Sequence, residues 1–559
     1  MKYFYSPEQQ FLFTNRQREL AALEYYNRNF INRQAEHIAL FGLRRIGKTL
    51  LLKEFMRRLL ENNDFSKIAF LDFSVLCSSP ENFALGYLGT LCYWFIEEGK
   101  TDPEPYLNPN SLSYALLRSG NEKLLEEIQP VIQELQRVRP DRQILLRKAL
   151  HFPRAAASIL GKRVVLICDE FQEIRTLENY PNGRNVLALF RSELQLQSEV
   201  QYILAGSAIS VLAGLFSNPN SPLFAQFTRM TIDSFEREGT RELVNKILAE
   251  PLDADFYPLI HSLTGGNPFY ITAVARQLGY LIDVIQRPTS SDLIKQAFLI
   301  ETLSPGGRIY DFCQYIYDLS LQKAKGYGAL KSVLQILSQE EGLTASQMAQ
   351  QLRVTSATAS DYLRWLCEVD LLIEKEKKYY YYDAVLRFWV GNVIRGVEVS
   401  LSAESLALKT LISRLDSQFQ RVAEELGEAQ ESLVRELMRH FHGQQVPGKL
   451  FNTSSEIVTL PKFVDVVSKM SANGQVEIDA YAEGDERWVA EVKWRNKRVG
   501  VKEIQKFMKI SDIFTAKGWY ISRAGFTADA LQYASENGVL LTDGSGLSTL
   551  RRMIGVIHS

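Results

Sequence analysis

The sequence lacks the patterns of a secreted, disulfide-bonded or membrane-spanning protein. Its 559 residues include only five cysteines, with no CxxC pair and no histidine at metal-binding spacing from them. Such cysteines are typical of small core residues in a reducing compartment. No apolar run approaches the ~18 residues of a membrane span, and MKYFYSPEQQFLFTNRQREL, at the N-terminus, lacks the apolar region of a signal peptide. We expect a cytoplasmic protein with no membrane partner.

Excess charge and low-complexity segments are also absent. The formal net charge is −1, so any nucleic-acid site must be a local patch of basic residues. The apolar and charged fractions are ordinary for folded protein. A chain of this length is too long for one hydrophobic core, and three or four domains are expected.

Short apolar runs alternate with helical patterns from about residue 36. HIALFG, KIAFLDFS, GKRVVLICDEF and VQYILAGS have the composition of buried strands, and KTLLLKEFMRRLL is an amphipathic helix. Strands separated by helices indicate a parallel sheet with helices on both faces. A helix-rich insertion at about 78–160 interrupts the pattern, and 235–322 is predicted to be helical.

A phosphate-binding motif lies between the first predicted strand and the first long helix. GLRRIGKT, at 42–49, matches G-x-x-x-x-G-K-[ST]. Its glycines let backbone N–H groups surround phosphate oxygens, and the helix N-terminus adds a favourable dipole. Lys48 is expected to reach the β and γ phosphates of ATP and Thr49 to hold Mg²⁺. The predicted nucleotide-binding residues of this segment are Gly42, Arg45, Gly47, Lys48, Thr49 and Leu50.

The strand RVVLICDEF supplies the acids that such a loop requires. Asp169 ends the apolar run, where it can ligate Mg²⁺ through water, and Glu170 is placed to polarise the attacking water. A buried strand ending in surface acids is the structural alternative. Together with the loop about 120 residues upstream, the pattern predicts a P-loop NTPase.

Several motifs together resemble the archaeal-type ATPases, a family of the AAA+ and STAND type. They are FTNRQREL, GLRRIGKT, CDEF, AGSAISVLAGLFSNPNSPLF and TGGNPFYI, in the family's order. The resemblance implies that Ser207 senses the γ-phosphate and that Asn15 and Arg16 lie near the adenine. It also implies that 266–268 belong to the helical lid, and it covers nearly the whole chain.

The chain departs from this family after the Ser-Pro-Leu segment. The family usually has a Gly-Arg pair there, whereas this sequence reads SPLFAQFTRM. Gln226 stands where the arginine is expected, and Arg229 is the nearest replacement. If that arginine acts on a neighbour's phosphate, hydrolysis or its coupling to assembly is in doubt. Arg229 is equally compatible with a surface salt bridge.

The segment 323–395 has the element order of a winged helix. LKSVLQILSQ, TASQMAQQL and TSATASDYLRWLCEVDLL are predicted helices, and IEKEKKYYYYD is a charged, aromatic hairpin. Short polar residues on the third helix, with lysines and tyrosines in the wing, suit nucleic acid. The alternative is a protein-interaction module that packs on the ATPase as a regulatory lid.

A second chemical motif lies in the hairpin VEIDAYAEGDERWVAEVKW, at 476–494. Strand alternation directs Glu491 and Lys493 to one face, with Asp479 on the antiparallel partner strand. Two carboxylates can hold one or two Mg²⁺ ions, and a lysine can stabilise the charge of phosphodiester cleavage. The alternative is a solvated face, because E-x-K alone is expected about twice in a random chain of this length.

The hairpin and its surroundings resemble the PD-(D/E)XK nucleases, such as Holliday-junction resolvases and restriction-type enzymes. The helix ESLVRELMRHF precedes the hairpin, and VGVKEIQKFMKI and GWYISRAGF follow it. The likeness implies that Glu431 is an additional catalytic acid, with Glu436 as a less favoured alternative. The family of ATPases named above also often carries such a domain at its C-terminus.

We therefore predict a multidomain α/β protein: a P-loop parallel-sheet ATPase core with a helical lid, a winged helix, and a restriction-endonuclease-like α/β domain. The expected boundaries are 1–234 for the core (insertion 78–160), 235–322 for the lid, 323–395 for the winged helix, 396–428 for a linker helix and 429–559 for the nuclease-like domain.

The favoured function is an ATPase that regulates Mg²⁺-dependent DNA cleavage. ATP and Mg²⁺ are the expected cofactors, DNA is the expected partner, and assembly with copies of itself is left open. The rival is a STAND-type switch or DNA-binding regulator whose nuclease-like domain is inert. A helicase-like motor is less favoured because the sequence shows no second P-loop domain.

Overall fold

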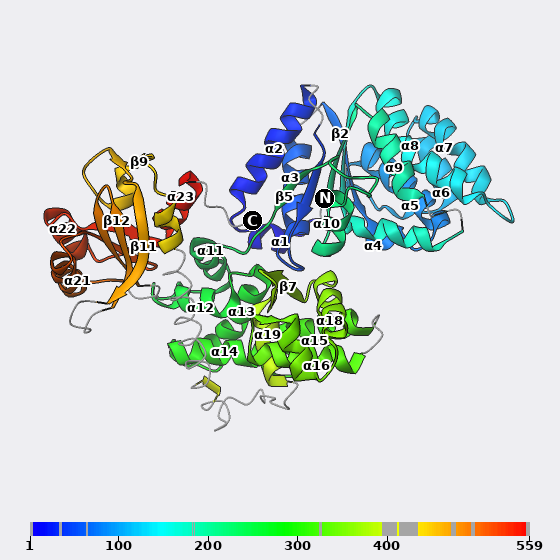
Figure 1. The fold of residues 1–559 in the computed structure, drawn as a ribbon. Coiled ribbons are helices and arrows are strands. Elements are labelled where there is room, and N and C mark those ends of the chain that lie inside the picture. The colour runs from blue at the N-terminus through cyan, green and yellow to red at the C-terminus, as the bar shows by residue number, and fades with distance from the viewer. Residues whose placement is uncertain are drawn as a thin grey trace. The chain divides into compact units, whose positions relative to one another are not determined.

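The computed structural model describes residues 4–32, 36–62, 65–181, 183, 185–322, 327–393, 411–412, 434–470, 477–493 and 498–554. The chain forms two compact units, Met1–Glu404 and Ser405–Ser559, each considered by itself. Figure 1 shows their secondary structure. Among the described residues, no helix combines the length and apolar character needed to cross a bilayer.

The first unit is built on a five-stranded parallel sheet with strand order β2-β3-β4-β1-β5. Its strands are β1 (Ile38–Phe41), β2 (Ser66–Asp72), β3 (Arg163–Asp169), β4 (Val200–Ala205) and β5 (Thr228–Thr231). The four strands predicted from apolar runs are confirmed, and the three central ones are buried throughout except at Arg163, the first residue of β3. The sequence did not predict β5, because the partly exposed edge strand TRMT has no apolar run.

Helices cover this sheet as a P-loop ATPase core requires. They are α1 (Pro7–Leu12), α2 (Gln17–Ile31), α3 (Lys48–Asn62), α4 (Phe73–Leu76), η2 (Phe171–Asn179), α9 (Val186–Leu196) and α10 (Ile209–Ser217). Phe30, Phe55 and Tyr202 are among the largest fully buried side chains of the core.

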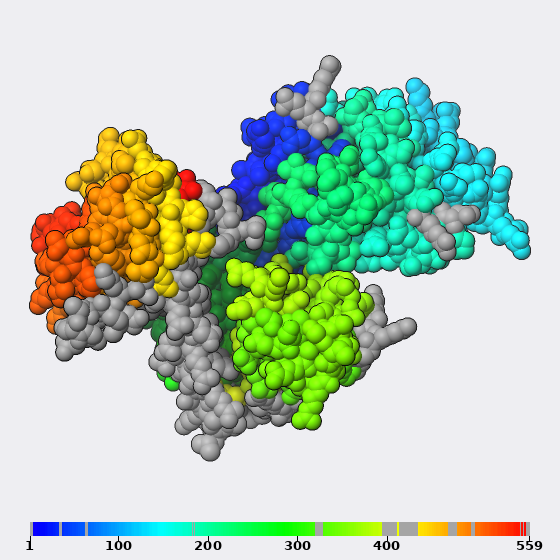
Figure 2. Space-filling view, in the orientation of Figure 1, coloured from blue at the N-terminus to red at the C-terminus, as the bar shows by residue number. Residues whose placement is uncertain are grey.

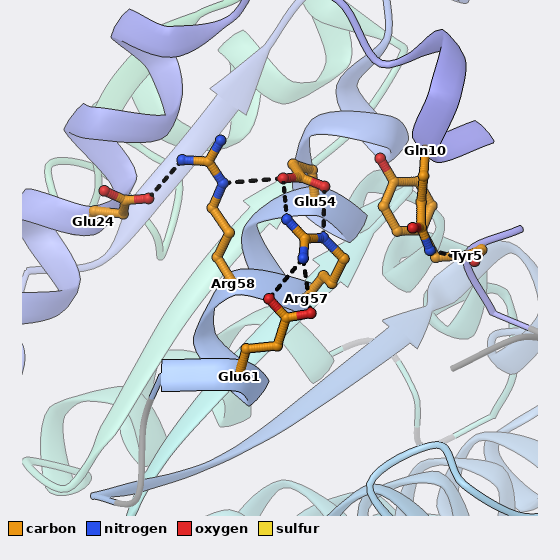
Figure 3. Close-up of polar contacts among 7 residues, drawn as sticks. All are labelled: Tyr5, Gln10, Glu24, Glu54, Arg57, Arg58 and Glu61. Carbon is orange, nitrogen blue, oxygen red and sulfur yellow. Dashed lines mark hydrogen bonds and ion pairs between the residues drawn. The ribbon is translucent and has the colours of Figure 1, made fainter. Parts of the chain in front are cut away.

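An ion-pair network fixes α3, the helix that follows the phosphate-binding motif (Figure 3). Glu54 accepts hydrogen bonds from Arg57 and Arg58, at 2.8 and 3.0 Å. Arg58 also donates to Glu24 of α2 at 3.2 Å, and Arg57 pairs with Glu61 one turn along α3. The network joins α2 to α3 and so holds the helix whose N-terminus carries Lys48.

The segment predicted as a helical insertion, about 78–160, is helical. It consists of α5 (Pro80–Glu97), η1 (Glu104–Tyr106), α6 (Pro109–Arg118), α7 (Glu122–Leu135) and α8 (Arg142–Leu160). Ser79 caps the N-terminus of α5 and Gly161 ends α8 in the left-handed conformation, at φ 60°. Figure 2 shows this lobe in cyan, projecting from the side of the core away from the blue α2.

The remainder of the first unit is helical up to a small three-stranded sheet. The predicted lid comprises α11 (Arg237–Ile247), α12 (Phe256–Thr264), α13 (Pro268–Asp283), α14 (Ser291–Leu303) and α15 (Arg308–Gln322). The next segment comprises α16 (Tyr327–Gln339), β6 (Leu343–Thr344), α17 (Ala345–Leu352), α18 (Ser356–Glu368), β7 (Leu372–Lys375), β8 (Lys378–Tyr381) and α19 (Ala384–Val393). Helices followed by the antiparallel pair β7–β8 match the element order expected for a winged helix.

The second unit is a mixed sheet with strand order β11-β12-β13-β14-β15. Its elements are β9 (Gln445–Pro447), η3 (Gly448–Phe451), β10 (Ile457–Thr459), β11 (Phe463–Met470), β12 (Glu477–Gly484), β13 (Arg487–Lys493), α21 (Val501–Ile513), β14 (Lys517–Ser522), α22 (Ala528–Glu536), β15 (Leu540–Asp543) and α23 (Gly544–Ile554). Residues 434–439 are also helical. Of the predicted linker helix at 396–428, only 411–412 lie within the described residues.

Two apolar clusters cover the two faces of this sheet. Trp488, Ala490 and Val492 of β13 belong to one cluster, together with Phe441. Val489 belongs to the other, with Ile504 of α21. The alternation confirms the predicted strand pattern and places Glu491 and Lys493, at the positions between, on the α21 face.

Candidate functional sites

The motif 42–49 forms the turn between β1 and α3. Gly47 has φ 99°, a conformation that glycine adopts without strain. A Cβ atom on Gly42 would lie 2.8 Å from the carbonyl oxygen of Ile232, so no larger residue fits there without a shift. The two glycines therefore serve the shape of the loop, and Leu50 lies in the first turn of α3.

Lys48 is 5% exposed and its ammonium group points back onto the loop. It donates to the carbonyl oxygens of Gly42 and Leu43 at 2.7 and 2.8 Å. Burial lowers the pKa of Lys48 to about 8, although the charges of Glu170 and Asp169 act in the opposite direction. A phosphate group at the loop would offer this partly desolvated ammonium a stronger, charged partner.

Thr49 and Asp169 meet across the edge of the sheet. The hydroxyl of Thr49 donates to Asp169 Oδ2 at 2.5 Å. Asp169 is 5% exposed at the end of β3, and burial raises the pKa of its carboxyl group. A hydroxyl and a carboxylate beside the phosphate-binding loop are the oxygen ligands that Mg²⁺ prefers. The donor set fits the ion, with Thr49 and Asp169 as the residues to hold it directly or through water.

Glu170 is held by two neighbours. Its Oε2 accepts hydrogen bonds from Ser207 Oγ, at 2.8 Å, and from the side chain of Gln172. Ser207 was predicted as a phosphate sensor; it lies just beyond β4 and contacts the carboxylate expected to polarise water. Gln172, 7% exposed, was not predicted, because a glutamine two residues after the acid has no distinctive sequence signal.

The side chain of Arg16 contacts the main chain of the motif loop. Its guanidinium donates to the carbonyl oxygen of Ile46 at 3.1 Å, pairs with Glu19 at 2.9 Å, and lies 4.7 Å from the centroid of the Phe235 ring. Asn15 precedes it and accepts a hydrogen bond from its amide. The contacts tie the N-terminal segment and the start of the lid to the loop, and the predicted adenine contact stays a prediction.

Arg45 joins the same loop to the lid. Its guanidinium carbon lies 4.2 Å from the ring centroid of Phe269, on α13, and 4.5 Å from that of Phe312, on α15. Such cation–π contacts contribute about 0.5–2 kcal/mol, depending on desolvation. Arg45 therefore links the turn between β1 and α3 to the helices α13 and α15.

Arg229 lies on the edge strand β5. Its guanidinium donates to the carbonyl oxygen of Phe216 at 3.3 Å, and the residue is exposed. Gln226, in the place of the family's arginine, donates to Phe224 O at 3.5 Å. These contacts are within one chain, so an action of Arg229 on a neighbouring molecule stays a prediction.

A carboxylate that follows α18 contacts the start of α10 in the core. Asp370, just after α18, accepts hydrogen bonds from Ser210 at the start of α10, from its N–H at 2.9 Å and its hydroxyl at 2.6 Å. Burial raises the pKa of Asp370, while the Ser210 bonds and the charge of Arg44 lower it. The charge of Asp370 also acts on Lys48. This contact was not predicted, because the two residues are 160 positions apart in the sequence.

The acids of the second unit occupy neighbouring strands. Ala480 pairs with Ala490, so Asp479 and Glu491 are the next residues of the antiparallel pair β12–β13. Opposite β11, the register shifts between the Val467–Tyr481 and Lys469–Ile478 pairs, around Asp479. Such bulges re-aim side chains and are frequent beside active sites.

Charge is concentrated around Glu491. Its carboxylate pairs with Lys493 at 2.5 Å, and Val492 N–H donates to Asp479 Oδ2 at 2.7 Å. Burial and the nearby charge of Asp479 raise the pKa of Glu491, while Lys493 and Lys506 lower it. Lys506, on α21, was not predicted because it is adjacent to the site only in the folded domain.

The oxygen donors at Asp479 and Glu491 fit Mg²⁺ as a two-carboxylate site. Among the described residues, no group of three or more His, Cys, Asp and Glu side chains converges as a complete metal cage. Glu431 lies outside the described residues, and Glu436 lies on the helix at 434–439. Neighbouring Arg435, which was not predicted, donates to the Asp479 carbonyl oxygen at 2.6 Å and ties that helix to the site.

Two protein families match separate parts of the chain. Residues 31–212 match the AAA domain family, and residues 462–551 match a restriction endonuclease family. The chain therefore contains an AAA ATPase-like domain and a restriction-endonuclease-like domain of the PD-(D/E)XK kind. None of the curated proteins compared with the chain matches it.

Solved structures with similarity to the chain include archaeal ATPases. A Walker-type ATPase of Pyrococcus abyssi has 16% identity and a TM-score of 0.46, over 68% of this chain and 96% of that one. The ORC2 protein of Aeropyrum pernix, with ADPNP and ADP, has 14% identity and a TM-score of 0.39, over 68% and 94%. Domain III of the Thermotoga maritima replication initiation protein DnaA has 12% identity and a TM-score of 0.29, over 52% and 96%. No residue role is carried over from these structures.

Proposed function

We propose that the chain is an ATP-regulated, metal-dependent DNA nuclease. The main observation behind this proposal is that Asp479 and Glu491 lie next to each other on the neighbouring strands β12 and β13, with Lys493 paired to Glu491. A merely solvated face would not require one acid to be largely buried beside another; the Glu491 side chain is 17% exposed. The match of this region to restriction endonucleases supports the same reading.

In the nuclease-like domain, Asp479 and Glu491 would hold Mg²⁺ and Lys493 would act beside them. The ion, when bound, supplies Lewis-acid stabilisation of the phosphodiester and lowers the pKa of a water. Lys493 pairs with Glu491 in the free protein. Its ammonium group could instead pair with a phosphate oxygen of bound DNA. Glu431 is proposed as a further acid of this site.

In the ATPase domain, Lys48 would exchange two carbonyl partners for the β and γ phosphates of ATP. Thr49 and Asp169 would hold Mg²⁺, and Glu170 would orient the attacking water. Glu170 must first release its bonds to Ser207 and Gln172, or share them with that water. The proposed nucleotide-contacting set is completed by Gly42, Arg45, Gly47, Leu50, Asn15, Arg16 and, from a neighbouring copy, Arg229.

Nucleotide would control the second activity through the winged helix. Asp370 brings a negative charge within range of Arg44 and Lys48, the cations that would receive the triphosphate. Because like charges repel, ATP would weaken the Asp370–Ser210 contact and favour release of this segment from the core. The predicted boundaries at 234, 322, 395 and 428 would then separate moving parts.

A second candidate function is an ATP-dependent switch or DNA-binding regulator with an inert nuclease-like domain. It is favoured by the same docking contact, and by the hold of Ser207 and Gln172 on Glu170, since both suit slow turnover. Such a switch would change partners or oligomeric state on binding ATP. It would not need Asp479 and Glu491 to bind a metal.

The test uses the purified full chain with branched, linear and single-stranded DNA, with Mg²⁺ or Mn²⁺, with and without ATP. Glu491→Ala removes a proposed metal ligand, and Lys48→Ala removes the phosphate contact. Glu483→Ala is the matched control, because this exposed acid of the same hairpin pairs only with Arg487 in the described structure.

Three outcomes separate the candidates. Metal-dependent cleavage that is lost in Glu491→Ala and retained in Glu483→Ala supports the nuclease. A change of that cleavage in Lys48→Ala supports control by ATP. ATP binding by the wild type without cleavage of any substrate would overturn the nuclease and favour the switch.

A further inference from the structure

Helix α21 lies on the same face of the sheet as Glu491 and Lys493. Its buried residues Ile504 and Phe507 belong to the cluster that contains Val489. The Phe507 ring meets that of Tyr520, which pairs with Glu491 in the register of β13 and β14, edge-on at 5.1 Å. Figure 1 shows α21 and α22 together on one side of the sheet. The buried side of α21 therefore faces the sheet, and its opposite side faces outward.

Three lysines form one stripe on that outward side. Lys502, Lys506 and Lys509 are exposed and follow the i, i+4, i+7 spacing of a single helix face. No carboxylate among the described residues forms an ion pair with any of them. Glu503, the one acid between them, instead accepts a hydrogen bond from the N–H of Gly500 at 3.3 Å.

The opposite end of the β12–β13 hairpin is different. There Arg487 pairs with Glu483 at 3.0 Å, and Lys517 approaches Glu486 at 3.9 Å. Arg487 and Lys517 are thus each close to an acid of the hairpin, whereas the three lysines of α21 form no ion pair among the described residues. The helix that carries the stripe packs on the face of the sheet that bears Glu491, and the charge of Lys506 acts on the Glu491 carboxyl group.

We infer that the α21 lysine stripe, Lys502, Lys506 and Lys509, binds the phosphate backbone of duplex DNA and guides one strand to the Asp479–Glu491 site. The inference rests on the proposed function for the identity of the partner. The stripe spans seven residues of helix, about 10 Å at 1.5 Å per residue. One DNA strand carries a phosphate about every 3.4 Å of helix axis, so this length offers about three phosphates.

The stripe supplies position and affinity, without base recognition. Lysine is a point charge on a flexible stem, and contacts to phosphate carry no direct sequence information. Each lysine that neutralises a phosphate releases counterions, so the logarithm of affinity falls by about 0.9 for each tenfold rise in salt. The triple variant is therefore expected to lower that salt slope by about 2.7.

The experiment measures fluorescence anisotropy of a labelled 30-base-pair duplex with the full chain in EDTA, over a KCl series. The test variant carries Lys502→Gln, Lys506→Gln and Lys509→Gln. The matched control carries the same exchange at Lys449, Lys462 and Lys517, which are exposed residues outside α21. Equal melting curves for both triple variants and the wild type establish that the domain remains folded.

A shallower salt slope for the stripe variant, with an unchanged control, supports the inference. A stripe variant that binds like the wild type, or a wild type that does not bind duplex DNA, overturns it. Stronger stripe-dependent binding to duplex RNA than to DNA overturns the assignment of the partner.

Cleavage in Mg²⁺ by the wild type and Glu491→Ala is measured in parallel, so the two proposals can fail separately. Lysine-dependent binding without any cleavage would support the proposed DNA-binding stripe and contradict the proposed nuclease activity. Glu491-dependent cleavage with stripe-independent binding does the reverse.

Discussion

Replacing Ser210 with alanine removes the hydroxyl that joins the ATPase core to α18 and to Asp370, which follows it. This hydroxyl donates to Asp370 at 2.6 Å, and it also lies 2.9 Å from the Cys367 carbonyl oxygen. A hydrogen bond to a charged group contributes about 1.5–3 kcal/mol. The contact is partly exposed and the Ser210 N–H still reaches Asp370, so the lower end applies. At about 1.4 kcal/mol per factor of ten, docking should weaken roughly tenfold.

Hydrogen exchange followed by mass spectrometry measures this change. Peptides covering residues 207–217 and 366–374 should exchange about tenfold faster in Ser210→Ala than in the wild type. ATP should accelerate the same peptides in the wild type and have a smaller additional effect in the variant. Ser332→Ala is the matched control, because its hydroxyl donates to Gly328 O within α16 at 3.1 Å.

The result that refutes the reasoning is unchanged exchange in both peptides for Ser210→Ala and for Asp370→Ala. The segments would then be held by apolar packing alone, and Asp370 would have no role in the response to nucleotide. Slower exchange with ATP in the wild type would also contradict it, because it would mean that the triphosphate strengthens docking.

Three further predictions concern the loop and the acids. The affinity for ATP, measured by calorimetry, should fall about tenfold from pH 7 to pH 9, because burial lowers the pKa of Lys48 to about 8 and the neutral amine cannot pair with phosphate; Lys48→Arg should flatten the profile. The stability of the free protein should change with pH in the opposite direction. It should rise between about pH 8, the pKa of Lys48 in the folded protein, and pH 10.5, its ordinary pKa, because the unfolded chain binds more protons in this range. Gly42→Ala should lower the free energy of unfolding by about 1–3 kcal/mol in a denaturant titration, because its Cβ would lie 2.8 Å from a main-chain carbonyl just after β5. Gly214→Ala, whose Cβ would meet nothing within 4 Å, should not be destabilising. Binding of Mn²⁺ to the second unit should weaken on acidification at a pH above the ordinary carboxyl range, because the pKa of Glu491 is raised, and Lys493→Met should move that loss to still higher pH; a titration curve that Lys493→Met leaves in place would contradict this.

Local sequence patterns were sufficient to predict the strands and the loop that position the candidate site residues. Strands β1 to β4 are mostly apolar. The P-loop motif carries its own geometry, because a side chain at Gly42 would lie close to Ile232 and Gly47 has a positive φ. The faces of β13 followed from period-two alternation alone. The sequence therefore predicted the fold class and the two chemical motifs, because each is encoded within a few neighbouring residues.

Contacts between distant segments could not be predicted in the same way. Asp370 meets Ser210 across 160 positions, and Lys506 approaches Glu491 only because α21 packs on β13 and β14. Strand β5 was missed for a related reason. As a partly exposed edge strand it needs no apolar run, and its identity depends on pairing with β1.

The charges near the P-loop give the direction of the proposed control. The charges of three carboxyl groups, those of Asp169, Glu170 and Asp370, favour protonated Lys48, and the charge of Arg44 acts on Asp370. Mg²⁺ bound with ATP would compensate the charge of Asp169, which is proposed to hold the ion, and that of the adjacent Glu170. Asp370 comes from another segment and would gain no such partner, so the triphosphate would act on it mainly by repulsion. The carboxylate most exposed to that repulsion is thus the one that bonds the segment after α18 to α10. Under the proposed function, ATP would therefore act as an undocking signal.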